Sequence, residues 1–168
     1  MRILFLFFML YAHLMAFEYV ITSSELNNSV AKKFPIERSL LFSKFIFAHP
    51  NFTIDKKSNT ILFSCEVTNN AFVLNNGDIP IFKVYTKSAI RYDGDSIYLK
   101  NIEVEHIYNK YISPQLEKQL IMSSEVLLNL YFSKRAIYRL DNANYAIRVM
   151  HSAIRDIVID DGAIKVKI

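Results

Sequence analysis

The side chains best suited to catalysis or metal binding in this sequence are a few histidines and one pair of glutamates. Outside the first sixteen residues the histidines are His49, His106 and His151. They are widely separated and show no HxxxH or HxH spacing, so a metal site would have to be assembled entirely by the fold. Glu103 and Glu105 alternate along one predicted strand and face the same side. Paired carboxylates can do acid–base work, but on such a strand they are more simply explained as solvated surface.

The single cysteine and the glycine content argue further against an enzyme. Cys65 follows Ile61 and Phe63 at alternate positions, which predicts that it is buried in a strand as a small, inert hydrophobic residue. A nucleophilic cysteine would need a histidine and a positively charged setting nearby. With three glycines the chain has no Gly-rich phosphate loop, and it has no nucleophile elbow and no HExxH motif. We therefore expect a protein that is not an enzyme and that requires no cofactor and no metal.

The basic residues are scattered along the chain. The formal net charge is +4, and the basic pairs Lys32–Lys33, Lys56–Lys57 and Lys134–Arg135 stand apart from one another in the sequence. Each pair is expected to lie in a solvated face or turn. No basic patch indicates a nucleic-acid partner.

The first sixteen residues have the pattern of a secretory signal peptide. Arg2 supplies a minimal basic region, residues 3–11 are apolar, and Ala16 offers a small residue for cleavage, although Leu14 departs from the usual pattern. The alternative is an uncleaved N-terminal anchor, but the apolar stretch is shorter than the ~20 residues needed to cross a bilayer. We predict export of a single domain comprising residues 17–168. No cysteine follows the apolar run closely, so a lipid-modified cysteine is not expected.

The longest helical pattern covers residues 113–131. Ser113 is a suitable N-cap and Pro114 suits the first helical position. One stripe carries Leu116, Leu120, Leu127 and Tyr131, flanked by Ile121, Leu128 and Phe132, whereas Lys118, Ser124, Glu125 and Asn129 are expected to face water. This apolar face either packs as the core of the domain or partly lines a cavity for an apolar ligand, and periodicity does not separate the two.

The other elements are predicted to be strands and shorter helices. A capping box formed by Thr22 and Glu25 starts a short helix over residues 23–33. Strands are expected at 17–21, at 40–54 with an interruption at His49–Pro50, at 61–67, at 79–90, at 97–104 with a bulge at Lys100–Asn101, and at 136–140, and a further extended piece begins at 72–74. The turn at 92–95, which contains Gly94, is expected to form a hairpin, and the chain is expected to close with a second hairpin of 157–159, the turn 160–162 with Gly162, and 164–168. A third helix is expected after Asn142 or Asn144. These elements predict an α+β fold in which a curved antiparallel β-sheet is wrapped around one long amphipathic helix, with shorter covering helices.

The order of these elements resembles one known family. The resemblance rests on the opening Phe17-Glu-Tyr-Val-Ile-Thr, the Ser-Glu-Leu-Asn helix start, the strands around 89–90 and 97–104, the segments 131–132 and 136–140, and the closing hairpin 154–168. Together they are similar to the YceB-like lipoproteins of Gram-negative bacteria, a domain of unknown function, except that the family's lipid-modified cysteine is missing. The family in turn resembles the tubular lipid-binding (BPI-like, TULIP) proteins, in which a curved sheet and a long helix enclose an apolar groove.

The resemblance implies a non-catalytic periplasmic protein that binds a lipid or other acyl-bearing molecule between the sheet and the long helix. Leu116, Leu120, Leu127 and Tyr131 are the candidate lining residues. Burial of an acyl chain of about 14 carbons would contribute on the order of 10 kcal/mol before entropic losses, at ~0.8 kcal/mol per methylene. The alternative is a cell-envelope protein–protein interaction module with a fully packed core. An enzyme would require the histidines to converge with Glu103 or Glu105 in one cleft.

Overall fold

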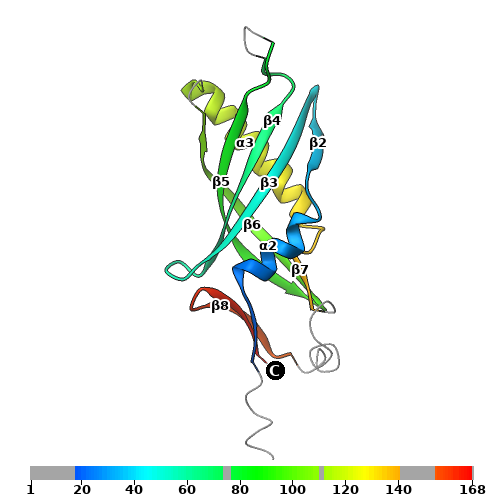
Figure 1. Ribbon diagram of the computed structural model, residues 1–168, viewed down its shortest axis with the longest axis vertical. Coiled ribbons are helices and arrows are strands. Elements are labelled where there is room, and N and C mark those ends of the chain that lie inside the picture. Colours follow the sequence, from blue (N-terminus) through cyan, green and yellow to red (C-terminus); the bar gives the residue numbers. More distant parts are fainter. Residues whose placement is uncertain (1–17, 74–76, 110–111, 141–153, 168) are drawn as a thin grey trace, which may run out of the picture.

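The computed structural model describes residues 18–73, 77–109, 112–140 and 154–167. Its elements, labelled as in Figure 1, are β1 (Glu18–Ile21), α2 (Ser23–Ala31), β2 (Ile36–Leu40), β3 (Ser43–Asp55), β4 (Thr60–Asn69), β5 (Ile81–Asp93), β6 (Ser96–Tyr108), α3 (Pro114–Phe132), β7 (Tyr138–Arg139), β8 (Asp156–Asp160) and β9 (Ala163–Lys167). The predicted signal segment and the predicted third helix lie outside the described residues. Within the described part, neither helix has the length and apolar character that a bilayer crossing requires.

The strands form two antiparallel sheets. The larger sheet has the order β2-β3-β4-β5-β6-β7, and the smaller one has the order β1-β9-β8. Figure 1 shows the smaller sheet at one end of the larger one, and α3 running across the larger sheet. The predicted fold class is therefore wrong, because the described chain is mostly β and its two sheets are not one curved sheet wrapped around a long helix. Alternating patterns located most strands, but they carry no information about which strands share a sheet.

The centre of the core is a cluster of phenylalanine rings. Phe63 of β4 stacks on Phe52 of β3 with ring centroids 4.5 Å apart. Phe132 at the end of α3 meets Phe63 edge-on at 5.7 Å, and Phe34 meets it at 6.2 Å. Offset-stacked and edge-to-face arrangements are the favourable ones for aromatic pairs. These four rings therefore join the larger sheet to the C-terminal end of α3.

Both helices begin as their sequences predict. The Thr22 hydroxyl accepts a hydrogen bond from the Glu25 amide (3.3 Å), and the Glu25 carboxylate accepts one from the Thr22 amide (2.9 Å), which completes a capping box. The Ser113 hydroxyl accepts a hydrogen bond from the Leu116 amide, and Pro114 occupies the first turn. The caps satisfy amides that the helices themselves cannot pair.

Each helix also pairs with the edge of a strand through an asparagine. The Asn27 side chain of α2 donates to the Phe52 carbonyl (2.7 Å) and accepts from the Phe52 amide (2.8 Å), as a neighbouring strand would. In the same way Asn129 of α3 donates to the Ile102 carbonyl (2.7 Å) and accepts from its amide (3.0 Å). The helices thus cover backbone groups of β3 and β6 that no strand pairs, which is one way in which proteins protect sheet edges.

Of the four α3 residues expected to face water, Lys118 is exposed as predicted, but the other three are not. Asn129 and Glu125 are half-buried rather than free in water, and Glu125 accepts a hydrogen bond from the Val104 amide of β6 at 3.1 Å. Ser124 is fully buried. Sequence periodicity marks the apolar face of a helix, but it does not show that polar residues next to that face will bind a strand edge.

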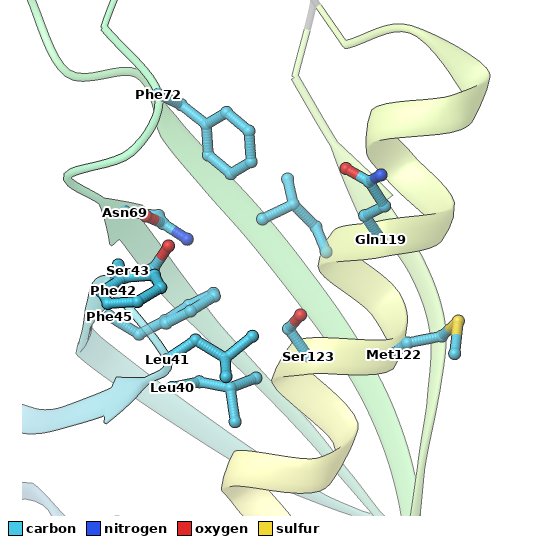
Figure 2. A pocket seen from close by; sticks show the side chains of 11 residues that line it. Leu40, Leu41, Phe42, Ser43, Phe45, Asn69, Phe72, Gln119, Met122 and Ser123 are labelled. Atoms are coloured by element: carbon cyan, nitrogen blue, oxygen red, sulfur yellow. The ribbon is translucent and has the colours of Figure 1, made fainter.

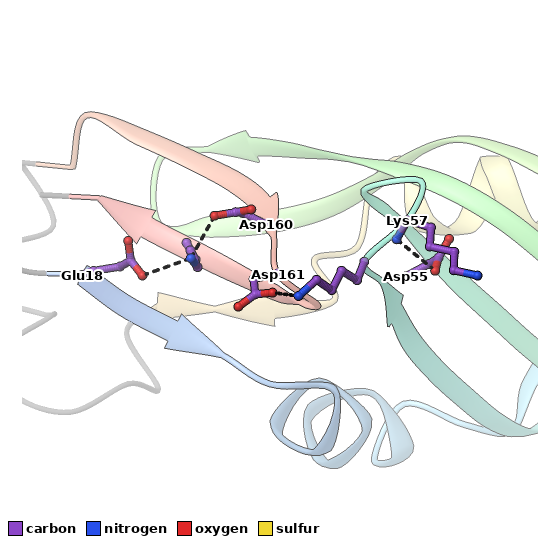
Figure 3. Close-up of polar contacts among 7 residues, drawn as sticks. Glu18, Asp55, Lys57, Asp160 and Asp161 are labelled. Carbon is purple, nitrogen blue, oxygen red and sulfur yellow. Dashed lines mark hydrogen bonds and ion pairs between the residues drawn. The ribbon is translucent and has the colours of Figure 1, made fainter.

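The two sheets are joined by polar contacts. The hydroxyl groups of Tyr19 (β1) and Tyr138 (β7) are hydrogen-bonded at 2.9 Å. Lys56, after β3, forms an ion pair with Asp161 in the β8–β9 turn, and this hydrogen bond lowers the pKa of Asp161 (Figure 3). Within the smaller sheet, Lys165 binds Asp160 at 2.8 Å. The contacts of Tyr19 with Tyr138 and of Lys56 with Asp161 link the smaller sheet to the larger one.

Several predicted irregularities of the strands are present. The pairing of β3 with β4 shifts register between Ala48 and Asn51, where the interruption at His49–Pro50 was expected. Asn101 has a positive φ of 52°, and the pairing of β5 with β6 shifts opposite it, as expected for a bulge. The turn between β2 and β3 was not predicted, because residues 40–54 were interpreted as one strand. That turn contributes one wall of the candidate site.

Candidate functional site

The turn between β2 and β3 is unusually apolar. β2 ends at Leu40 and β3 begins opposite it at Ser43, so that Leu41 and Phe42 alone form the turn. Their side chains are 90% and 101% exposed, respectively. Leu41 has a φ of +54°, a left-handed conformation that costs a residue with a Cβ atom about 1–2 kcal/mol. Strained backbone of this kind persists where the surrounding structure enforces it, and it occurs often at binding sites.

A pocket of about 380 Å³ separates this turn from α3. It is lined by Leu40, Leu41, Phe42, Ser43, Phe45, Asn69, Phe72, Gln119, Leu120, Met122 and Ser123. In Figure 2 the side chains of Leu40 and Leu41 extend toward α3, and Phe72 extends into the same space from the chain that follows β4. The pocket therefore lies between three separate parts of the fold, and the exposed turn leaves it open to solvent.

The inner wall of the pocket is apolar and rigidly held. Phe45 and Leu120 are 3% and 1% exposed, so their positions are fixed by the core. Phe72 meets the ring of Phe82 edge-on at 6.2 Å. The Asn69 side chain accepts a hydrogen bond from the Ala71 amide at 2.8 Å, which fixes the segment that carries Phe72.

The polar groups at the pocket are neutral. Among the described residues that line it, Ser43, Asn69, Gln119 and Ser123 supply hydroxyl or amide groups, and none carries a charge. An ion entering this space would lose hydration without gaining a counter-charge, which is unfavourable. The pocket is thus suited to an uncharged, largely apolar group that reaches at most a few hydrogen-bonding partners at the rim.

The structure places the four predicted lining residues in different surroundings. Leu120 lines the pocket. Leu116 is half-buried and lines a smaller neighbouring pocket of about 210 Å³, which shares Phe72 with the first. Leu127 and Tyr131 are buried in the hydrophobic core, at 3% and 6% exposure. The N-terminal half of the predicted stripe therefore faces the pockets, whereas the C-terminal half packs in the hydrophobic core.

Sequence reasoning missed the residues on the opposite wall of the pocket. Leu40, Leu41 and Phe42 were interpreted as the interior of a strand because the turn contains no Gly, Pro, Asn or Asp, the residues that mark turns. Phe45 and Phe72 were assigned to extended segments without a role. The one available signal was the three consecutive apolar residues, which break the alternation of a half-exposed strand.

Of the residues singled out for possible chemistry, the described structure brings only Glu105 and His106, which are neighbours on β6, to one pocket of about 230 Å³. His49 lies on β3, with its Nδ1 2.8 Å from the Glu66 carboxylate at the surface, whereas β4 and β5 separate it from His106 on β6. Glu103 and Glu105 are exposed on β6, and His151 lies outside the described residues. Within the described part of the chain, no three His, Cys, Asp or Glu side chains come close enough to hold a metal ion.

Cys65 is buried in β4, as its alternating pattern predicted, with 1% of its surface exposed. Burial raises the pKa of its thiol well above the usual range, and the nearby Glu66 carboxylate adds to this effect. Because the thiolate is the reactive form of cysteine, these surroundings suppress nucleophilic chemistry at Cys65.

Neither the family models nor the curated proteins assign a role to the pocket. No protein-family model matches the sequence, and no curated protein is significantly similar to it. The resemblance to the YceB-like family accordingly stays a prediction, and the function is argued from the geometry of the pocket.

Proposed function

We propose that this protein is a non-catalytic binder of a lipid or another hydrophobic molecule, and that the pocket between the β2–β3 turn and α3 receives an apolar part of the ligand. The observation that carries this proposal is the combination of an uncharged apolar pocket with two fully exposed apolar side chains, Leu41 and Phe42, at its rim. Apolar side chains at an exposed hairpin tip do not stabilise the free protein, but their transfer from water into contact with a ligand is favourable.

The size of the pocket suits one apolar segment of a ligand. Its volume of about 380 Å³ lies within the range of 300–1,000 Å³ that is usual for small-molecule sites. Each methylene transferred from water contributes about 0.8 kcal/mol, so that a short stretch of acyl chain offsets part of the entropic cost of binding. Contacts with Leu41 and Phe42 outside the pocket would extend the buried apolar area.

Cellular location is part of the same proposal. The sequence of residues 1–16 predicts a signal peptide, and the resemblance to the YceB-like family implies the periplasm of a Gram-negative bacterium. A periplasmic protein that covers an acyl chain would keep that chain out of water between membranes. A lipid or acyl-bearing small molecule is therefore the expected partner, and none of these steps requires a cofactor.

Binding to the pocket is tested by removing the rim. The double substitution Leu41→Ser and Phe42→Ser should weaken the binding of a fluorescent C14 fatty acid at least tenfold, because it removes the apolar side chains that would cover the ligand. Titration of the fatty acid into the purified protein measures this change. Both side chains are exposed, so the fold should be unaffected.

The control removes two apolar side chains that are also exposed, though less fully, from another surface. Val126 and Leu130 of α3 are 49% and 60% exposed and do not line this pocket. Val126→Ser with Leu130→Ser should leave fatty-acid binding unchanged. Equal loss in both double variants would indicate nonspecific adsorption, and the proposal would also be contradicted if native protein carried no lipid in mass spectrometry and took up no fatty acid.

One observation favours a second candidate function, an envelope interaction module. Met122, Val126 and Leu130 are spaced four residues apart and form an exposed apolar stripe on α3, with 61%, 49% and 60% exposure. Residues at this spacing share one helical face, which a partner protein could cover. This function predicts a stoichiometric partner whose binding depends on Val126 and Leu130 and not on Leu41 and Phe42.

A further inference from the structure

A second cavity, distinct from the apolar pocket, has a basic wall. It has a volume of about 520 Å³ and lies where the C-terminal end of α2 meets β7. Its lining residues are Glu25, Asn28, Ser29, Lys32, Lys33, Tyr138 and Arg139. The fold therefore places the Lys32–Lys33 pair and Arg139, which is distant in the sequence, around the same cavity.

The cations of this region are crowded. Lys33 is half-buried, its ammonium donates a hydrogen bond to the Ala136 carbonyl, and its pKa is lowered by burial and then by the positive charges of Arg139 and Arg135. Arg135 also lies over the ring of Tyr131, at 5.2 Å from its centroid. Holding like charges together beside a half-buried lysine costs free energy, which a bound anion would offset.

Carboxylates only partly balance these charges. Among the described residues, neither Lys32 nor Lys33 forms an ion pair with a carboxylate, while Arg139 pairs with Asp95 at 3.3 Å on the surface. Glu25 also lines the cavity, but its carboxylate accepts hydrogen bonds from Thr22. Glu25 stands in the first turn of α2 and Lys32 is its C-cap, about 10 Å farther along the helix axis, so the two charges lie near opposite ends of the helix.

A favourable interaction with the helix dipole explains the lysines only in part. Cations at a helix C-terminus interact favourably with the helix dipole, which accounts for the position of Lys32 and Lys33 at the end of α2. It does not account for the convergence of Arg139 from β7, nor for the placing of the neutral groups of Asn28 and Ser29 in the same cavity. Two ammonium groups, a guanidinium and neutral donors form the set that commonly binds phosphate oxygens.

We propose that this cavity, the basic cleft (Lys32, Lys33 and Arg139 with Asn28 and Ser29), binds the phosphate group of a small phosphomonoester or of an anionic lipid headgroup. A phosphomonoester carries a charge of about −1.5 to −2 at neutral pH, which matches the two lysines. The inference does not depend on the apolar pocket, so either site can be disproved while the other stands.

The test compares two doubly substituted proteins of equal net charge. Lys32→Gln with Lys33→Gln removes two charges from the basic cleft, whereas Lys57→Gln with Lys118→Gln removes two exposed charges elsewhere. Calorimetric titration with glycerol 3-phosphate should show saturable binding to the wild type, at least tenfold weaker binding to the first variant and no change for the second. Should the double variant not fold, Lys32→Gln alone is compared with Lys57→Gln alone, because both positions are exposed and each variant loses one charge.

Vesicles separate the two sources of the phosphate group. Binding of glycerol 3-phosphate supports a soluble ligand, and binding only to phosphatidylcholine vesicles that contain phosphatidic acid, lost selectively in the cleft variant, supports a lipid headgroup. Absence of saturable binding to either, or equal weakening in both doubly substituted proteins, overturns the proposal. Binding of a DNA oligonucleotide without binding of either phosphomonoester probe also overturns it.

Discussion

Replacing Phe63 by alanine is expected to lower the free energy of unfolding by about 3–5 kcal/mol, the range observed for large aromatic side chains removed from cores. Phe63 is 1% exposed, and its ring contacts those of Phe34, Phe52 and Phe132. Its removal leaves a cavity where the larger sheet meets the end of α3. Since whole domains are stabilised by only about 5–15 kcal/mol, the loss is a large share of the total.

Urea denaturation measures this change, and the chain provides a matched control. Phe42→Ala deletes the same side chain from a fully exposed position, so its effect on stability should stay within about 0.5 kcal/mol. A similar, small loss in both variants would show that the phenylalanine cluster is not the centre of the core. Because Phe42 lines the apolar pocket, Phe42→Ala is expected to weaken ligand binding while leaving stability almost unchanged, so the two properties are separated.

The second large effect is expected at Asn129. Asn129→Ala removes both hydrogen bonds to Ile102 and leaves a half-buried amide and carbonyl of β6 without their partner on α3. An unpaired buried polar group costs about 1–3 kcal/mol, so we expect a total loss of about 2–4 kcal/mol. Urea denaturation gives the total, and hydrogen exchange should show faster exchange of the Ile102 amide in particular.

Two further variants define the mechanism at Asn129. Asn129→Asp keeps an acceptor for the Ile102 amide but turns a carboxylate oxygen toward the carbonyls of Ile102 and Glu125, so its stability should be no higher than that of Asn129→Ala. Asn28→Ala makes the same change at an exposed helical position, where little loss is expected. Unchanged protection of the Ile102 amide in Asn129→Ala would show that the helix does not replace a strand at this edge.

Local signals in the sequence located most elements of the fold. The capping box of Thr22 and Glu25 and the Ser113–Pro114 start predicted both helices because capping chemistry is confined to a few neighbouring residues. Likewise Gly94 and Gly162 have positive φ angles of 65° and 76° in the turns that their sequences predicted. Such features depend on residues that are close in the chain, so they can be recognised without knowledge of the tertiary structure.

Long-range relationships were beyond the same reasoning. The pairing of β1 with β9, which creates the smaller sheet, joins two alternating segments whose patterns would fit many partners. The asparagines that pair with strand edges look like ordinary solvated residues in a helical pattern. Only Leu120 of the predicted site residues lines the apolar pocket, because the opposite wall of this pocket comes from a turn that contains no typical turn residues.

The pairing of β1 with β9 has a consequence for how the chain closes. Glu18 lies opposite Lys167, so one of the first described residues meets one of the last. This strand pair has to wait until almost the whole chain is available, and contacts of such large sequence separation form slowly because a long loop must first be closed. We therefore expect the β1–β9–β8 sheet to form late during folding, after the phenylalanine cluster of the larger sheet.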